Sequence, residues 1–323
     1  MRFKLDVAAA TLIALGAALP AVAQSWPTKP IRMLIPYPAG GTSDILARMI
    51  GPKLTEVWGP QVLVDNRVGA NGNIAMDITA RAPADGYTMA LNDLGNFAIS
   101  PSMYSKLPFD IIRDFTPIAM ISYSAHLLTV HPSVPVKTVA ELITLAKNSP
   151  GKLNMPVGLG AAVHLAGLSL EQRSGAKWTY VPTKGGQASI MTVATGEGDL
   201  LFMGMLQTLP HVKSGRLKLI AVSSEKRDPN LPNVPTVSET PGLAGFVTGS
   251  YQGIIGPAKV SPEIVSKSNA EINRVLGLPD IKEKLAAYGT VPLPMSPQEL
   301  GKWLVAEKDS WAKVVKTSGF KID

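Results

Sequence analysis

The short run GGTSD (40–44) is the stretch of this sequence best suited to chemistry. It follows an apolar run, IRMLI (31–35), and precedes residues whose apolar positions have helical spacing. A strand that ends in glycines and leads directly into a helix points several unpaired backbone N–H groups at one spot. Glycine also lets a ligand come close to that backbone. The junction at Gly40 and Gly41 therefore predicts an anion-binding loop.

A second stretch repeats this layout. The apolar run LNMPV (153–157) leads into GLGAAVH (158–164) and then into another helical pattern. Two such units suggest two similar sheets, each presenting a helix N-terminus. Ligands of open α/β sheets bind outside the carboxyl ends of the strands. If two domains face each other, both loops line one cleft.

Two titratable residues lie in the first turns of the expected helices. Asp44 can cap its helix, because a carboxylate is favoured at the positive end of the helix dipole, or it can organise the loop. His164 can donate a hydrogen bond into the cleft or pack at the domain surface. Ser43, Asp44 and His164 could also form a catalytic triad across the cleft, in a closed geometry that sequence spacing does not define.

Other chemistries lack their residues. The sequence has no cysteine, which excludes a thiol nucleophile and a thiolate metal site. It has no G-x-S-x-G motif, and GLGAAV (158–163) lacks the third glycine of a dinucleotide-binding fingerprint. No two histidines have the i,i+3 or i,i+4 spacing of a helical metal pair; they are His126, His131, His164 and His211. We expect no cofactor and no metal.

The stretches that position these residues alternate between strand and helix patterns, which is typical of an α/β fold. Strands are predicted at 31–35, 61–66, 87–91, 127–131, 153–157, 179–183, 199–203 and 217–222. Helices are predicted at 43–56, 73–81, 138–148, 161–173, 187–195, 205–214, 262–277 and 297–319. We expect mostly parallel sheets in two domains, with crossovers near 119–127 and 220–250. The second crossover is rich in proline and glycine, as a linker is.

The first 23 residues have the layout of a secretory signal peptide. Arg2 and Lys4 precede an apolar run, and small residues at 21–23 provide a cleavage site before Gln24. A retained membrane anchor is the alternative, but the run is short for a bilayer span. We expect cleavage after Ala23 and a periplasmic mature protein.

The composition fits an exported globular protein. Apolar residues make up 46% and charged residues 17%, which is enough to build a core, and a core of this size needs no disulfides. The formal charge of +7 favours anionic small ligands or a membrane surface, or it is simply a basic solvent-exposed surface. Because no block rich in lysine and arginine contains interleaved aromatic residues, we expect no nucleic acid partner.

Several motifs, in order and spacing, resemble the Bug-type receptors of tripartite tricarboxylate transporters, which are periplasmic solute-binding proteins. The resemblance covers essentially the whole mature chain. Its motifs are WPTKPIRMLIPYPAGGTSDILAR (26–48), VLVDNRVGANGNIA (62–75), DGYTMAL (85–91), HPSVPVKTVAELITLAKNSPGKLN (131–154), HLAG (164–167), VPTKGG (181–186) and LIAVSSEKRDPNLPNVPTVSETPG (219–242).

The resemblance implies two α/β domains that close on a ligand like a flytrap. It implies a carboxylate held by the two loops through backbone amides and ordered water, and delivery of that solute to membrane permease subunits. We place domain 1 at 24–122 plus 245–323 and domain 2 at 123–244. Two alternatives remain: an exported hydrolase that uses His164 with a cleft serine, and a receptor that serves a sensor kinase.

The sequence departs from the family pattern around the expected pocket. Alanines and a valine occupy 161–163, where Ser or Thr usually precedes HLAG, and Thr183 replaces the aromatic residue of VPYKG. Met203 begins a Met-Gly-Met run where a polar or acidic residue is usual. Asp93 adds an acid where small hydroxyl residues are common. The expected pocket is therefore less hydroxyl-rich and more apolar.

These departures guide the expected ligand. The Asp93 carboxylate either favours a cationic or donor group on the ligand over a second anion, or caps the following turn. With Met203 and Tyr251 as an apolar wall, we expect a monocarboxylate with an apolar or aromatic body. The expected ligand-binding residues are Tyr37, Gly40, Gly41, Thr42, Ser43, Asp44, Asp93, Gly160, Ala161, Ala162, His164, Thr183, Met203 and Tyr251.

Overall fold

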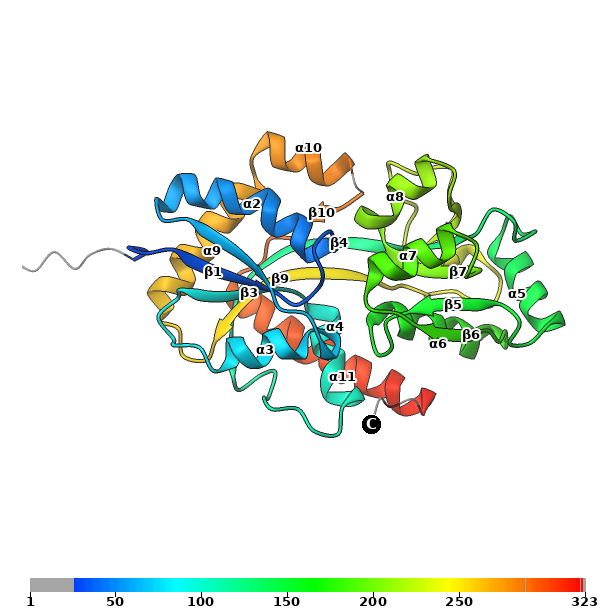
Figure 1. Ribbon diagram of the computed structural model, residues 1–323, viewed down its shortest axis with the longest axis horizontal. Helices are drawn as coiled ribbons and strands as arrows, with labels where there is room; N and C mark the ends of the chain where they lie inside the picture. The colour runs from blue at the N-terminus through cyan, green and yellow to red at the C-terminus, as the bar shows by residue number, and fades with distance from the viewer. Residues whose placement is uncertain (1–25, 288, 320, 322–323) are drawn as a thin grey trace, which may run out of the picture.

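The computed structural model describes residues 26–287, 289–319 and 321, so the expected signal peptide at 1–23 lies outside the described residues. The described chain forms two α/β lobes (Figure 1). Two long strands, β4 (Phe115–Val130) and β9 (Gly249–Pro257), connect the lobes. No helix among the described residues is both long and apolar enough to cross a bilayer.

The first lobe is built on a sheet with the strand order β10-β4-β9-β3-β1-β2. Strand β1 pairs in parallel with β2 and β3, and β9 runs antiparallel to β3 and β4. Besides β4 and β9, the elements of this lobe are β1 (Ile31–Ile35), α2 (Thr42–Trp58), β2 (Val62–Asn66), η1 (Ala70–Gly72), α3 (Asn73–Ala80), β3 (Thr88–Asp93), α4 (Leu94–Met103), α9 (Pro262–Leu276), α10 (Pro279–Ala287), β10 (Val291–Pro292) and α11 (Pro297–Ser318).

The second lobe is built around residues 126–130 at the end of β4, with which β7 and β8 pair in antiparallel fashion. It also contains a separate parallel pair of strands, β5 and β6. Its core is a cluster of residues between Leu128 and Phe246. The elements of this lobe are α5 (Val139–Asn148), β5 (Asn154–Val157), α6 (Ala162–Ser174), β6 (Thr179–Pro182), α7 (Gly186–Ala194), β7 (Leu200–Gly204), α8 (Met205–Lys213), β8 (Lys218–Val222) and η2 (Val237–Glu239).

The main sheet is mixed, which corrects the expected mostly parallel pairing. Strand β4 carries the chain into the second lobe and β9 brings it back, so these two neighbours run in opposite directions. The antiparallel pairings all involve β4 or β9. The α/β class and the two-lobed arrangement are as the sequence predicts.

Two elements that shape the site are not predicted from the sequence. Helix α4 contains Gly95 and Pro101 and is buried on several sides, so it lacks a one-sided apolar pattern. Strand β9 begins at the end of the expected crossover 220–250 and carries buried Ser250 and Gln252 between glycines. Most of β4 also falls outside the predicted strand at 127–131.

Candidate functional site

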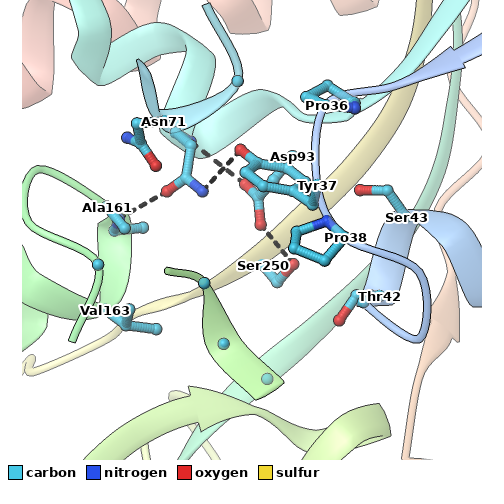
Figure 2. A pocket seen from close by; sticks show the side chains of 18 of the residues that line it. Pro36, Tyr37, Pro38, Thr42, Ser43, Asn71, Asp93, Ala161, Val163 and Ser250 are labelled. Atoms are coloured by element: carbon cyan, nitrogen blue, oxygen red, sulfur yellow. Dashed lines mark hydrogen bonds between the residues drawn. The ribbon is translucent and has the colours of Figure 1, made fainter. Parts of the chain in front are cut away.

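A cavity of about 420 Å³ is lined by residues of both lobes (Figure 2). A cavity of this size suits a small organic ligand. The first lobe lines it with residues 36–38, 41–43 and 68–72, together with Asp93, Asn96, Tyr104, Ser250 and Gln252. The rest of the lining comes from His126 of β4 and, in the second lobe, from residues 158–159, 161–163, 183–187, 203–204 and Gln207.

The first loop is organised by Gly40 and Asp44. Gly40 has a φ of +80°, in the left-handed region that glycine tolerates. Its N–H donates to Asp44 Oδ2 at 2.9 Å, and Asp44 also accepts from Arg48 Nε and Asn66 Nδ2, each at 3.0 Å. Burial raises the pKa of Asp44, but the hydrogen bonds from Arg48, Gly40 and Asn66 bring it below its ordinary value. Asp44 thus stays ionised behind the loop and does not line the cavity.

The second loop repeats the backbone geometry of the first. Gly160 has a φ of +79°, and its N–H donates to Nδ1 of His164 at 3.1 Å. The next residues, Gly41 and Ala161, also match, with φ and ψ of −72° and 163° against −76° and 160°. In both loops the side chain four positions after the glycine accepts its N–H. The sequence echo is therefore a structural repeat.

His164 supports the second loop from inside the fold. Its side chain is buried and meets the ring of Tyr180 edge-on, with the centroids 4.6 Å apart. Burial lowers the pKa of His164 to about 4, so it is neutral near pH 7. The expectation that His164 reaches into the cleft is wrong; it packs behind the loop.

Among the described helices, five begin at the cavity without a side-chain cap. Their N-cap residues, all of which line the cavity, are Gly41 of α2, Gly72 of α3, Ala161 of α6, Gly185 of α7 and Gly204 of α8. The first N–H groups of a helix have no partner within it and carry the positive end of its dipole. Five such ends around one space favour an anion there.

One of these N–H groups is taken by a side chain of the opposite lobe. The N–H of Ala162 donates to Asn96 Oδ1 at 2.6 Å, and Asn96 Nδ2 donates to the hydroxyl oxygen of Tyr37 at 2.9 Å. A second bond between the lobes runs from Gln207 Nε2 to Thr42 Oγ1 at 2.7 Å. Burial raises the pKa of Tyr37 far above its ordinary value, so it remains a neutral hydroxyl. The lobes are thus in direct contact across the cavity.

Asp93 is the N-cap of α4. Its Oδ1 accepts from the N–H groups of Gly95 and Asn96 at 3.0 and 3.2 Å, and its Oδ2 accepts from Ser250 Oγ at 2.6 Å and Gln252 Nε2 at 3.1 Å. Burial raises its pKa to about 6, against the opposing effect of the hydrogen bonds. Of the two interpretations from sequence, the structure shows the cap. The side chain also lines the cavity.

The predicted site residues fall into three groups. Those that line the cavity are Tyr37, Gly41, Thr42, Ser43, Asp93, Ala161, Ala162, Thr183 and Met203. Those that do not line the cavity but hold the two loops in shape are Gly40, Asp44, Gly160 and His164. Tyr251 is outside the cavity and packs against Tyr123 and Trp303 in tilted ring contacts, with ring centroids 4.9 Å apart in each pair. Side chains alternate along a strand, so its neighbours Ser250 and Gln252 face the cavity instead.

Several residues that line the cavity are not predicted from the sequence. Asn71 lies in VGANGN (68–73), a turn between a strand and a helix whose glycines and asparagines were a usable signal. Lys184 follows Thr183 in VPTKGG (181–186) and was not assigned a role. Asn96, Ser250 and Gln252 lie on α4 and β9, which sequence patterns did not predict.

The geometry does not assemble a hydrolase. The cavity serines donate to other groups, Ser43 to Gln252 Oε1 at 2.6 Å and Ser250 to Asp93, and His164 lies behind its loop. Within the described residues, no three His, Asp or Glu side chains form a group that could hold a metal ion.

Comparison with known proteins agrees with this geometry. The sequence model described as "Tripartite tricarboxylate transporter family receptor" matches residues 46–320. The protein BugT of Bordetella pertussis is 31% identical over 309 residues, which cover 95% of this chain and 94% of BugT. The structure titled "R. palustris Rpa4515 with adipate" is 35% identical, has a TM-score of 0.88, and aligns over 92% of this chain and 99% of that one. MatC from Rhodopseudomonas palustris with bound malate is 28% identical, has a TM-score of 0.84, and aligns over 90% and 100%.

Proposed function

Because the chain belongs to the tripartite tricarboxylate transporter receptor family, we propose that it captures a small carboxylate in the periplasm and delivers it to the permease subunits of such a transporter. Receptors of this family bind solutes and are not enzymes, so the chain is not an enzyme. We also propose that the signal peptide is cleaved after Ala23 when the protein is exported. Amino-terminal sequencing of the exported protein checks that step, and a mature protein that begins at Met1 would contradict it.

The main support for this proposal is that several helices begin at the cavity without a side-chain cap. First-turn N–H groups at the cavity lack the side-chain acceptors that N-cap residues usually supply, so an anionic ligand can provide them. Lys184 lies at the cavity, is exposed, and has no ion-pair partner among the described residues. Its ammonium adds positive charge near the α7 start. A carboxylate satisfies both features at once.

The ligand in this proposal has an apolar body. Side chains of Val68, Leu159, Val163 and Met203 line the cavity and can pack against carbon atoms. A monocarboxylate with an apolar or aromatic body stays a prediction. Its support is the apolar lining and not Asp93, because both carboxylate oxygens of Asp93 already accept protein hydrogen bonds. The ligands named for the two solved neighbours, adipate and malate, are dicarboxylates.

We further propose that the two lobes are the two domains of the receptor, with domain 1 at 24–122 plus 245–323 and domain 2 at 123–244. The core clusters support this division. One cluster uses residues from Leu128 to Leu243 together with Phe246, which lies just past the boundary at 244, and another joins residues from Leu34 to Met120 with residues from Ile255 to Leu304. The two domains would close on the ligand, which must contact both to favour the closed state.

Calorimetry with matched acids and amides tests the function. Benzoate, succinate, malate and adipate are titrated into the protein beside benzamide, succinamide, malamide and adipamide. We expect at least one carboxylate to bind saturably at one site and to be recovered unchanged, and its amide to bind at least about tenfold more weakly, since it cannot accept charge-assisted hydrogen bonds. Amides that bind as tightly as the acids would contradict an anion site.

A further inference from the structure

His126 is a polar residue at the cavity that is not needed to bind the carboxylate group at the helix starts. It lies on β4 beside Gly204, the residue at which α8 begins. The residue lines the cavity and is 1% exposed. What an imidazole offers a ligand depends on which ring nitrogen carries the proton.

The hydrogen bonds among His126, Thr248 and Ser223 determine which ring nitrogen carries the proton. Ser223 Oγ lies 2.7 Å from the carbonyl oxygen of Thr248, which has no proton to give, so the hydroxyl proton of Ser223 points there. Thr248 Oγ1 lies 2.9 Å from Ser223 Oγ, and this contact must use the hydroxyl proton of Thr248. Thr248 Oγ1 can then only accept at its 3.0 Å contact with His126 Nδ1. The proton therefore resides on Nδ1.

The other nitrogen, Nε2, is left as an acceptor. Burial lowers the pKa of His126 to about 3, so near neutral pH the ring carries one proton, and Nδ1 holds it. Among the described residues, no group donates a hydrogen bond to Nε2. The cavity is otherwise rich in donors, because backbone N–H groups at five helix starts surround it.

Two other acceptors at the cavity are less suited to select a ligand. Both oxygens of Asp93 already accept hydrogen bonds from protein groups. The side-chain amide of Gln207 contacts the Thr42 hydroxyl, which can donate or accept, so that amide can turn over to suit a ligand. The ring of His126 has no such freedom, because Thr248 fixes its proton.

We propose that His126 Nε2 makes the receptor select a carboxylate that carries a hydrogen-bond donor, a hydroxyl or an N–H group, over the same carboxylate without it. The inference rests on the proposed function, since a carboxylate must first enter the cavity. Its anionic end takes N–H groups at the helix starts, and its donor meets Nε2. An analogue without the donor excludes water from Nε2 and leaves this buried acceptor unpaired, which is why it is rejected.

Matched ligand pairs test the selection. Malate with succinate, 3-hydroxybutyrate with butyrate, and 4-hydroxybenzoate with benzoate are titrated by calorimetry. We expect the hydroxylated member of at least one pair to bind about 3- to 10-fold more tightly, the range for one neutral hydrogen bond. Equal or weaker binding of the hydroxylated member in every pair that binds would overturn the proposal.

Two variants separate Nε2 from the rest of the ring. His126→Asn can keep a donor for Thr248 but has no acceptor at the position of Nε2, so the preference should fall to about onefold. His126→Gln can place an acceptor near that position and should keep part of the preference. If His126→Asn keeps the full preference, Nε2 is not its source. Should both variants fail to fold, Thr248→Val, which lies outside the cavity lining and frees the ring proton, should reduce the preference.

The tautomer can be measured without any ligand. In ¹⁵N-histidine-labelled protein, we expect a protonated, pyrrole-like shift for His126 Nδ1 and a bare, pyridine-like shift for Nε2. The reverse assignment would overturn the inference. If no carboxylate binds, the proposed function fails while the tautomer result still stands, so the two failures are distinguishable.

Discussion

Helices that begin at the cavity differ from helices that begin at the surface. The surface helices α5, α9 and α11 start at Thr138, Ser261 and Ser296, whose side chains accept the N–H of the third helical residue. The cavity helices α2, α3, α6, α7 and α8 start at glycine or alanine, which have no acceptor to offer. A side-chain cap contributes about 1 kcal/mol to stability. The cavity therefore keeps donors available that the rest of the protein satisfies internally.

Helix α4 is an exception among the helices that begin at the cavity, because its start has a side-chain cap. It also begins at the cavity, but Asp93 caps it and is itself held by Ser250 and Gln252. Its neighbour Asn96 then accepts the Ala162 N–H from the opposite lobe. Helix α4 thus contributes a contact between the lobes in place of an open helix start.

The largest expected effect comes from adding a cap at the cavity. Ala161 has an ordinary φ of −76°, so Ala161→Asp fits the backbone and places a carboxylate at the first turn of α6, where the Val163 N–H is open while the Ala162 N–H donates to Asn96. We expect affinity for the tightest carboxylate to fall roughly 100-fold through like-charge repulsion and lost donors, while stability stays equal or rises by about 1 kcal/mol. Calorimetry and thermal melting measure the two changes.

The neutral variant Ala161→Asn is the matched control. It can cap the helix without a charge and should lose less affinity than Ala161→Asp. Parent-like affinity in the aspartate variant would remove the α6 start from the site.

Removal of the cavity lysine should have the next largest effect. Lys184→Gln deletes a positive charge at the cavity, and we expect a 3- to 10-fold loss of affinity together with a weaker dependence on salt, because exposed charges are screened. Titrations at low and high ionic strength measure both. The control Lys152→Gln changes an exposed lysine outside the lining and should leave binding unchanged. Equal losses in the two variants would mean that only net charge matters.

Acidification should strengthen binding modestly. The pKa of Asp93 is raised by burial to about 6, so between pH 7.5 and 5.5 this carboxyl gains a proton and the cavity loses negative charge. We expect about 2- to 5-fold tighter binding of an acid that stays ionised in this range. The raised pKa of Asp93 also makes the fold more stable at low pH. This contribution is fully present below the unfolded-state pKa near 4 and is lost as pH rises through the folded-state pKa of about 6.

The variant Asp93→Asn checks that assignment, since it should flatten the pH dependence of affinity. His126 and Tyr37 keep one protonation state over this range, because burial lowers the pKa of the first to about 3 and raises that of the second. An unchanged pH profile in Asp93→Asn would assign the effect to another group.

The smallest effect on binding is expected at a surface cap. Thr138→Ala removes the side chain that accepts the Glu141 N–H at 3.1 Å. We expect a loss of about 1 kcal/mol in the free energy of unfolding by urea and no change in affinity. A loss of affinity here would break the distinction between surface and cavity helices.

Local patterns in the sequence were enough to predict the two loops and the helices that follow them. The strand at 31–35 and the Gly-Gly junction after it identify one helix start, and GLGAAVH (158–164) identifies the second. Their partners could not be predicted this way. That Asp44 and His164 turn back to accept the glycine N–H groups depends on loop closure, and spacing alone left other roles open.

Long-range strand pairing brings together the site residues that the sequence does not predict. Strand β9 pairs with β3 and β4, which are distant in sequence, and these pairings bring Gln252 to Asp93 and Ser43. A shift of one residue along a strand turns a side chain to the other face, which is why Tyr251 was expected at the cavity and Ser250 was not. The sequence predicts no role for His126, because the partners of its backbone N–H and of its ring, Ser223 and Thr248, are about a hundred residues away in the sequence.

Amide chemical shifts during a carboxylate titration test the central claim most directly. In ¹H–¹⁵N spectra recorded while the tightest-binding carboxylate is added, we expect the largest saturable downfield amide proton shifts at Thr42, Ser43, Val163 and Gly186, at the open helix starts. The amides of Glu141, Ile264 and Glu299, which donate to surface caps, should not move. Shifts confined to other residues, or equal shifts at capped and open starts, would contradict the account.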